Sequence, residues 1–174
     1  MQKTYVLRNG RVAPGEGAED SVIVYLDPTT EEKRELVDSL KLDEHTLTSA
    51  LDPDELPRLE FEPQHMAMIL KRPRNYSGSD EYDFNVNSLG MFLFKDRLII
   101  VAKDTDPFVG DRPITGAHTP LDLALRLIYR TIYHFLEHLK VIRMISDELE
   151  DKINASMQNK YLINLFSLGK SLVY

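Results

Sequence analysis

The sequence predicts an α/β fold of the α+β type, an αβα sandwich whose sheet is mixed and partly antiparallel, followed by a long helical pair. Segments rich in β-branched and aromatic residues dominate the chain as far as Lys103, and two short helical patterns interrupt them. From Thr119 onward, apolar residues recur mainly at alternating steps of four and three, which is typical of a long amphipathic helix. We therefore expect a mixed α/β domain over residues 1–112 and long antiparallel helices over residues 113–174.

The composition is that of a folded protein with an acidic surface. The 174 residues include 21 basic and 28 acidic side chains, which gives a formal charge of −7. Phosphate binding needs clustered Lys and Arg, so nucleic acid is not expected as a partner. Cysteine is absent, which excludes disulfides, thiol catalysis and Cys-ligated metals. No stretch approaches the roughly 20 apolar residues of a membrane helix, and we expect the chain as given to be soluble.

The first part of the chain predicts two strands followed by two helices. Residues 4–8 and 21–26 are rich in β-branched residues and tyrosine, and a Pro-Gly loop lies between them. The run Asp27-Pro28-Thr29-Thr30 opens a helix, because proline and the acidic residues that follow favour a first turn. A second helix is expected over residues 43–51, with Asp43 as its cap. The side chains expected to face the core from these helices are Leu36, Val37, Leu40, Leu47 and Leu51.

The next part predicts the remaining strands. Residues 58–62 are short and extended, and residues 65–72 are apolar on both faces, which favours a central strand. A long strand over residues 82–94 turns at Lys95-Asp96-Arg97 and returns over residues 98–103. Strands joined by such a hairpin are antiparallel, so we expect a mixed sheet. One face of the long strand carries Phe84, Val86, Phe92 and Phe94, and the other carries Leu89, Met91 and Leu93.

The last part predicts two helices. Thr119 caps the first, Pro120 occupies its first position, and it extends about 50 Å to Ile153 before a turn at residues 154–156. The second covers residues 159–174 and ends in the middle of its apolar pattern, so we expect the chain to stop inside a longer helix. The apolar stripe expected on the first helix consists of Ala124, Ile128, Ile132, Phe135, Leu139, Ile142, Ile145, Leu149 and Ile153.

One helical motif suggests metal chemistry. His134, Glu137 and His138 match H-x-x-E-H, the inverted zinc-protease motif, in which two imidazoles hold zinc and the glutamate acts as base. The motif lies in an uninterrupted amphipathic helix, and the acidic residues Glu148, Glu150 and Asp151 are too far along the axis to supply a third ligand. A zinc hydrolase is therefore the less favoured alternative, and we expect no enzyme activity.

A second group of candidate ligands is acidic. Asp52, Asp54 and Glu55 lie in a stretch that could bind a hard cation such as Mg²⁺ through carboxylate oxygens. The residues alone favour a different interpretation of the stretch, a solvated surface with helix caps. No cofactor is required by any motif, and no catalytic constellation is present in the sequence. From the residues alone, the chain resembles an assembly or sensing module.

Several segments resemble the CorA-type magnesium transporter family. The most specific is Leu51-Asp52-Pro53-Asp54-Glu55-Leu56-Pro57-Arg58-Leu59-Glu60-Phe61, followed by the strand at residues 66–71. The hairpin return at residues 98–101, the acidic helical run at residues 145–150 and the end at residues 170–174 follow in the same order. The Gly-Met-Asn signature of the family's pore mouth is absent, and Gly90-Met91-Phe92 is not its counterpart.

The resemblance implies a cytoplasmic regulatory domain of a transporter of Mg²⁺, or of Co²⁺ or Zn²⁺, located at the cytoplasmic face of the membrane. Family members continue into a stalk helix and two transmembrane helices, and they assemble as pentamers in which divalent cations between cytosolic domains hold the pore closed. Thr48, Ser49 and Ile132 occupy positions where the family has acidic ligands, so either the metal ligands here are other acids, with Asp52, Asp54 and Glu55 nearest, or regulation differs in this protein. The competing hypothesis is a standalone helical scaffold that oligomerises through its helices.

Overall fold

The computed structural model describes residues 1–15, 21–74, 84–109, 113–156, 158–170 and 172. These residues divide into two compact units. The first, the sheet unit, consists of Met1–Lys71 and Asn87–Arg130, and the second, the helical unit, of Arg72–Val86 and Thr131–Tyr174. The boundary at residues 112 and 113 expected from the sequence stays a prediction.

The described strands form one seven-stranded sheet in the order β2-β1-β3-β7-β6-β5-β4. The pair β3–β7 is parallel, whereas β1–β2, β1–β3, β6–β7 and β4–β5 are antiparallel, which confirms the mixed sheet. The middle strand β7 is buried at every position, as expected for a strand covered on both faces. The strands are β1 (Gln2–Arg8), β2 (Arg11–Pro14), β3 (Val22–Leu26), β4 (Arg58–Phe61), β5 (Met66–Pro73), β6 (Val86–Leu93) and β7 (Leu98–Ala102).

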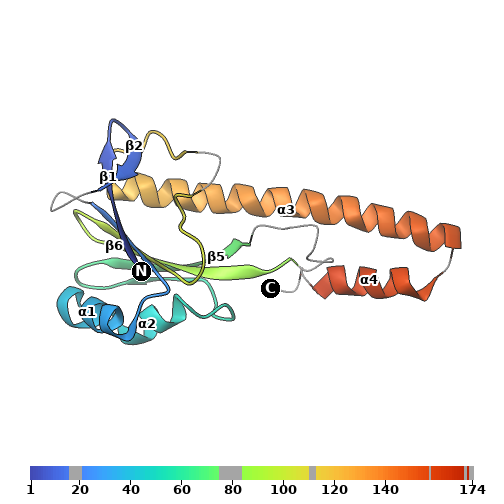
Figure 1. Cartoon of the computed structure of the whole chain (residues 1–174), viewed down its shortest axis with the longest axis horizontal. Helices are drawn as coiled ribbons and strands as arrows, with labels where there is room; N and C mark the ends of the chain where they lie inside the picture. The colour runs from blue at the N-terminus through green and yellow to red at the C-terminus, as the bar shows by residue number, and fades with distance from the viewer. Residues whose placement is uncertain (16–20, 75–83, 110–112, 157, 171, 173–174) are drawn as a thin grey trace. The chain divides into compact units, whose positions relative to one another are not determined.

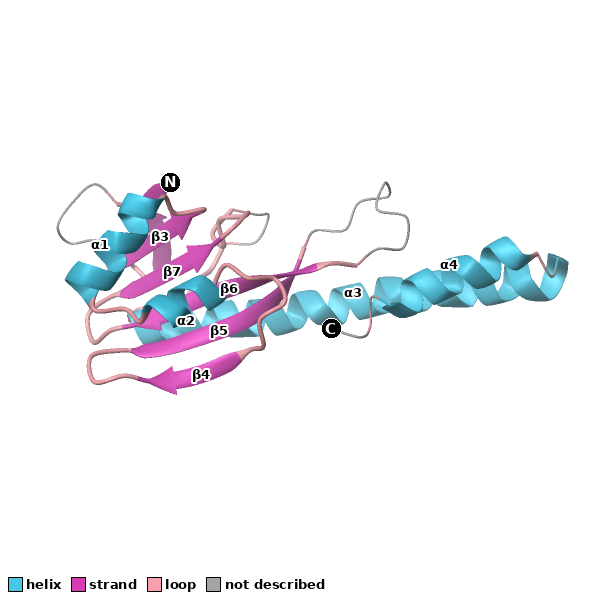
Figure 2. Ribbon diagram, turned by 90° about the horizontal axis from the view of Figure 1, so that it is seen from below, coloured by secondary structure: helices cyan, strands magenta, loops and turns pink. Residues whose placement is uncertain are grey.

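Two short helices, α1 (Thr30–Leu40) and α2 (Glu44–Ser49), cover one face of the sheet, as Figures 1 and 2 show. Thr29 begins α1 with a capping box, in which its hydroxyl accepts from the Glu32 N–H while the Glu32 carboxylate accepts from the Thr29 N–H. Asp43 caps α2 by accepting the Thr46 N–H. The buried residues of this layer are Tyr25, Leu36, Leu42, Leu47, Ala50, Ala67, Ile69, Phe92, Ile99 and Val101.

The beginning of the long helix α3 (Pro120–Ser156) covers the opposite face. Leu123, Ala124 and Leu127 contribute to a core that includes Leu89 and Met91 of β6. Phe92 of the same strand belongs to the core on the α1 and α2 side, so the expected alternation is confirmed for residues 89–93. Phe84, expected on the same face as Phe92, lies before β6 and packs in a separate cluster with Ile142, Leu149 and Leu168. The αβα sandwich predicted from the sequence is therefore present in the sheet unit.

Gly90 lets α2 approach the sheet closely. A Cβ atom at Gly90 would lie 2.4 Å from the Cβ of Ala50, the residue that ends α2. Real Cβ atoms do not approach one another so closely, and the contact leaves no room for a side chain on this face of β6. The glycine therefore fixes the height of α2, and of the loop that follows it, above the strands.

A buried carboxylate fastens β1 to the segment between β7 and α3. Asp106 is 3% exposed and accepts hydrogen bonds from the Tyr5 hydroxyl at 2.5 Å and the Lys3 ammonium at 2.9 Å. Its other oxygen accepts the Phe108 N–H at 2.9 Å. Burial and the hydrogen bond to Asp106 raise the pKa of Tyr5 above its ordinary value. The charge is thus fully compensated inside the protein.

The helical unit contains the second part of α3 and helix α4 (Asn159–Lys170), which lie side by side. Ile142 and Leu149 of α3 and Leu168 of α4 form a buried cluster with Phe84. This confirms the predicted helical pair. The cluster is small, because most other apolar side chains of α4 are partly or fully exposed.

The structure corrects several expectations in the sheet. Residues 11–14 form a strand, β2, that the sequence pattern does not predict. The turn at Asn9 and Gly10 has positive φ and folds the chain back on β1. The strand expected at the centre of the sheet, β5, is second from the edge. Both of its faces are apolar because helices cover the sheet on both sides at this strand. The strand expected over residues 82–94 spans Val86–Leu93, and Tyr82 and Asp83 lie outside the described residues.

The structure also corrects the helical part. The predicted turn at residues 154–156 is the last turn of α3. Ile132 and Leu139, expected in the buried stripe, are 54% and 49% exposed. The helix has 3.6 residues per turn, whereas the apolar stripe repeats every 3.5 residues. The stripe therefore winds gradually around the helix, and one straight neighbouring helix cannot cover all of the stripe. The second helix ends at Lys170, and Ser171, Val173 and Tyr174 lie outside the described residues.

Candidate functional site

The candidate site is the acidic loop, residues 52–57, which connects α2 to β4. Its first turn is closed by the Asp52 carboxylate, which accepts the Asp54 N–H at 2.9 Å. The Asp52 N–H donates to the Ser49 carbonyl at 3.2 Å, so the loop continues directly from the end of α2. Proline at positions 53 and 57 restricts the backbone further. The side chains of Asp52 and Asp54 are exposed on this turn.

Two side chains from neighbouring strands attach this loop to the sheet. Ser88 of β6 donates its hydroxyl to the Asp52 carbonyl, and Lys71 of β5 donates to the Pro53 carbonyl. Lys71 also donates to the Ser88 hydroxyl at 3.2 Å. Both strands lie in the ordered sheet, so the backbone of the loop is held on a rigid support.

The Lys71 ammonium is a positive charge close to the acidic side chains of the loop. Burial lowers the pKa of Lys71, while the nearby carboxylates of Asp52, Asp54 and Glu55 act in the opposite direction. The ammonium reduces the mutual repulsion of these carboxylates when no cation is present.

Glu55 belongs to an internal network rather than to the exposed turn. Its carboxylate accepts the Ser49 hydroxyl at 2.8 Å and lies 3.1 Å from the Arg58 guanidinium. Arg58 also donates to Glu60 at 2.7 Å, and Glu60 accepts the Thr46 hydroxyl at 2.8 Å. The hydrogen bond from Ser49 is the main cause that lowers the pKa of Glu55. The network ties the end of the loop to α2.

The three predicted ligands thus differ in exposure and in their partners within the chain. Asp52 and Asp54 are adjacent and exposed, whereas both oxygens of Glu55 already have partners within the chain. In the described part of the chain, no group of three or more His, Asp or Glu side chains could hold a metal ion. A metal role for Asp52, Asp54 and Glu55 therefore stays a prediction. Lys71 and Ser88 were missed, although a lone serine within an apolar strand was a usable signal.

The H-x-x-E-H motif has a different environment. The rings of His134 and His138 lie 4.6 Å apart between centroids, at an interplanar angle of 80°. Phe84 contacts His138 edge-on, with 5.4 Å between ring centroids. Burial, and then the neighbouring His134, lower the pKa of His138. Since no third His, Asp or Glu joins this pair into a metal-binding group within the described residues, the three-ligand site of a zinc hydrolase is not formed there.

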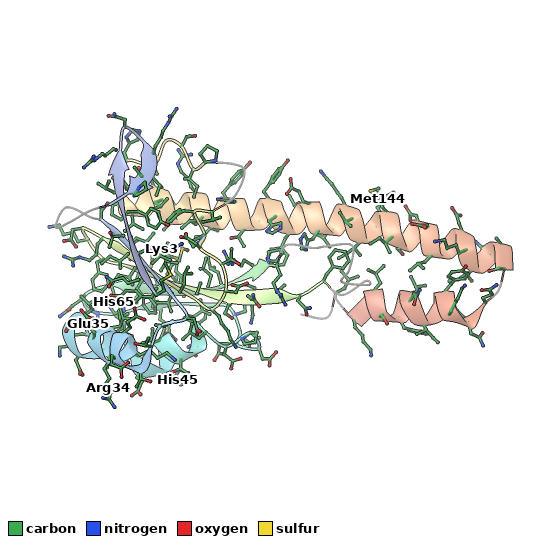
Figure 3. All side chains as sticks on the ribbon, viewed as in Figure 1. Lys3, Arg34, Glu35, His45, His65 and Met144 are labelled. Carbon is green, nitrogen blue, oxygen red and sulfur yellow. The ribbon has the colours of Figure 1, made fainter. Side chains whose placement is uncertain are left out.

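His65, which directly precedes β5, is buried, and it has no polar partner among the described residues. It is 7% exposed and stacks on Phe94, with 4.9 Å between ring centroids. Among the described residues, neither ring nitrogen has a hydrogen-bond partner. Burial lowers the pKa of His65, and the opposing effect of Glu62 is smaller. Figure 3 labels His65 and the exposed His45 of α2.

Replacing His65 with phenylalanine is expected to stabilise the protein. The change removes buried nitrogens that have no partner, which is worth about 1 kcal/mol at neutral pH. Because the folded-state pKa lies below the unfolded value near 6.5, the unfolded state takes up the proton first and the native protein loses stability as pH falls through about 6.5. The advantage of His65→Phe should therefore grow between about pH 6.5 and pH 5, as measured by urea unfolding.

The matched control for this prediction is His45→Phe, since His45 is exposed on α2. It should not reproduce the gain in unfolding free energy expected for His65→Phe. A His65→Phe protein that is less stable than the parent at both pH values would contradict the assignment of an unsatisfied imidazole.

Comparisons with known proteins agree on one family. Residues 22–174 match the family described as CorA-like Mg²⁺ transporter protein. A curated relative, the cobalt/magnesium transport protein CorA of Methanocaldococcus jannaschii, is 26% identical over 168 residues, which include 90% of this chain and 51% of the relative. The chain thus spans about half the length of this curated relative.

Solved structures share the fold. The soluble domain of CorA from Methanocaldococcus jannaschii has a TM-score of 0.68 at 22% identity, covering 88% of this chain and 63% of that one. The cytoplasmic domain of ZntB from Vibrio parahaemolyticus has a TM-score of 0.63 at 15% identity, covering 94% of this chain and 72% of that one. Within the residues that the structure describes, no helix has the length and apolar character needed to cross a bilayer.

Proposed function

Because the chain belongs to the family of CorA-like Mg²⁺ transporter proteins, we propose that it serves as the cytoplasmic regulatory domain of a divalent-cation transporter. The family match over residues 22–174 carries this proposal, since it takes in most of the sheet, the acidic loop and both long helices. The domain would act at the cytoplasmic face of the membrane, in a homo-oligomer, a pentamer, whose transmembrane helices form the pore. It would be a sensor and not an enzyme.

The acidic loop supplies the sensing surface in this proposal. The exposed carboxylates of Asp52 and Asp54 stand on a backbone whose carbonyls accept hydrogen bonds from Lys71 and Ser88, so the loop that carries them is already attached to the sheet before a cation binds. When acidic surfaces of neighbouring subunits face one another, they repel, and Mg²⁺ bridging their oxygens removes the repulsion. Ions that bind the closed arrangement better shift the population towards it. Glu55 would position the loop through Arg58 rather than bind the ion first.

The proposal is tested by a chimera. Residues 1–174 replace the aligned segment of the Methanocaldococcus jannaschii CorA protein, and Mg²⁺ uptake into proteoliposomes is measured against the Mg²⁺ concentration on the cytoplasmic side. We expect uptake that falls as cytoplasmic Mg²⁺ rises. The double variant Asp52→Asn, Asp54→Asn should need about tenfold more Mg²⁺ for the same inhibition, because two ligand charges are lost.

The matched control neutralises acids away from the loop, Glu35→Gln and Asp38→Asn on the exposed surface of α1. It should leave the inhibition curve in place. Equal uptake at all Mg²⁺ concentrations in a chimera that assembles would contradict the regulatory role. A normal curve in the loop variant would contradict the assignment of Asp52 and Asp54.

A further inference from the structure

We propose that His134 and His138 form a two-residue chelate for a divalent transition ion of the nitrogen-preferring class, with Cu²⁺ and Ni²⁺ favoured. The two residues are four apart on α3, so both imidazoles lie on one face of the helix, one turn apart. Both belong to the helical unit, and their ring centroids are 4.6 Å apart. The acidic loop belongs to the other unit, so this inference does not depend on the proposed function.

The separation of the rings matches that of two imidazoles on one ion. A metal lies about 2.0–2.1 Å from an imidazole nitrogen, which places the ion about 3.2 Å from the ring centroid. Two rings bound at 90° would then have centroids about 4.5 Å apart, and two rings at the tetrahedral angle about 5.2 Å apart. The observed 4.6 Å is close to the first value. Adjacent positions at 90° are typical of the tetragonal geometry of Cu²⁺ and Ni²⁺.

The surroundings limit the motion of one ligand. Phe84 is 7% exposed and packs edge-on against His138, and the His138 side chain is itself partly buried. A ring held in this way loses less rotational freedom when it binds an ion, which favours chelation. Burial also favours the neutral imidazole, the form that ligates metals. Water would complete the coordination of the ion, since the pair supplies two ligands.

The ligand chemistry excludes Mg²⁺ as the natural occupant of this pair. Mg²⁺ prefers oxygen ligands and octahedral water, whereas imidazole nitrogen suits Cu²⁺, Ni²⁺ and Zn²⁺. The expected order of affinity is Cu²⁺ above both Ni²⁺ and Zn²⁺. An ion that bridges successive turns of α3 binds the helix but not the unfolded chain, so it should stabilise the helical unit.

The test uses the full chain and the metal chlorides alone. Isothermal titration with NiCl₂ measures affinity, and the electron paramagnetic resonance spectrum of the Cu²⁺ complex reports nitrogen ligands directly. We expect one ion per chain with two nitrogen ligands on Cu²⁺. His134→Gln and His138→Gln should each weaken Ni²⁺ binding by about tenfold or more, because a chelate becomes a single ligand.

Two controls keep the result interpretable. His45→Gln and His118→Gln alter exposed histidines elsewhere in the described chain and should leave Ni²⁺ affinity unchanged. His138→Phe retains an aromatic ring beside Phe84, and circular dichroism verifies that each variant is folded. Unchanged affinity in the folded double variant His134→Gln, His138→Gln would overturn the proposal. Equal competition by MgCl₂, or a Cu²⁺ spectrum without two nitrogen ligands, would overturn it as well.

Discussion

Replacing Asp106 with alanine is expected to cost about 3–5 kcal/mol of unfolding free energy, because it removes a buried carboxylate that accepts hydrogen bonds from three partly buried groups. The carboxylate accepts from the Tyr5 hydroxyl, the Lys3 ammonium and the Phe108 N–H, and it is almost completely buried. None of these groups gains an equivalent partner from alanine. The change should also loosen β1 from the segment before α3, and urea unfolding monitored by circular dichroism measures the loss.

The effect of Asp106 should depend on pH in a defined direction. Burial alone would raise the pKa of Asp106, but the hydrogen bonds from Tyr5, Phe108 and Lys3 outweigh it and hold the pKa below its ordinary value. Because the pKa of Asp106 is lower in the folded state than in the unfolded state, its ionised carboxylate contributes its full stabilisation above the unfolded-state pKa near 3.9. This contribution is lost as the pH falls through the folded-state pKa. The difference between parent and Asp106→Ala should therefore shrink below about pH 4.

Two further variants separate this network from a general loss of charge. Tyr5→Phe removes one hydrogen bond to a charged acceptor and should cost about 1.5–3 kcal/mol. Asp38→Asn neutralises an exposed carboxylate of α1 and should change stability by less than about 0.5 kcal/mol. Equal effects of Asp38→Asn and Asp106→Ala would show that the buried network contributes nothing of its own.

Substituting Gly90 with alanine is expected to destabilise the sheet unit by about 1–3 kcal/mol or more, through overpacking. The new Cβ would lie 2.4 Å from the Cβ of Ala50, and neither the strand nor the end of α2 can move without disturbing its neighbours. The expected response is a displacement of α2 together with the acidic loop. Thermal unfolding measures the loss of stability, and the Mg²⁺ response of the chimera reports the displaced loop.

A compensating change provides the sharpest control for Gly90. Ala50→Gly removes the atom that the new methyl group meets, so the double variant should recover part of the stability lost by Gly90→Ala alone. Gly169→Ala, in α4, meets no atom within 4 Å and should be neutral or slightly stabilising. Strict additivity of Gly90→Ala and Ala50→Gly would show that the close contact is not the cause.

Most of the fold could be predicted from local patterns, and the exceptions have identifiable causes. Alternation along residues 89–93 placed Leu89 and Met91 on one side of the sheet and Phe92 on the other, because strand geometry fixes side-chain direction. The strand β2 was missed because its four residues carry only a weak pattern and depend on the turn before them. The exposure of Ile132 follows from the mismatch between the 3.6-residue repeat of a helix and the 3.5-residue repeat of the stripe, which the list of apolar residues alone does not reveal.

The candidate site was predicted only in part. The run containing Asp52 and Asp54 was recognisable from its residues, and the exposure of both fits a binding surface. The role of Glu55 was not recognisable from the sequence, because its contacts with Ser49 and Arg58 depend on the geometry of the turn. Lys71 and Ser88 anchor the loop through contacts between distant parts of the sequence. Ser88 and Asp52, for example, are 36 positions apart, and local patterns do not reveal such a contact.

The parallel pairing of β3 with β7 has a consequence for how the chain acquires its structure. Val22 pairs with Leu98, so the middle of the sheet closes only after a long intervening segment has been synthesised. Pairings between such distant positions are slow to form, because the entropy of loop closure opposes them before any contact is gained. On the ribosome, the N-terminal strands would wait with an unpaired edge, and chaperone protection would matter most during that interval.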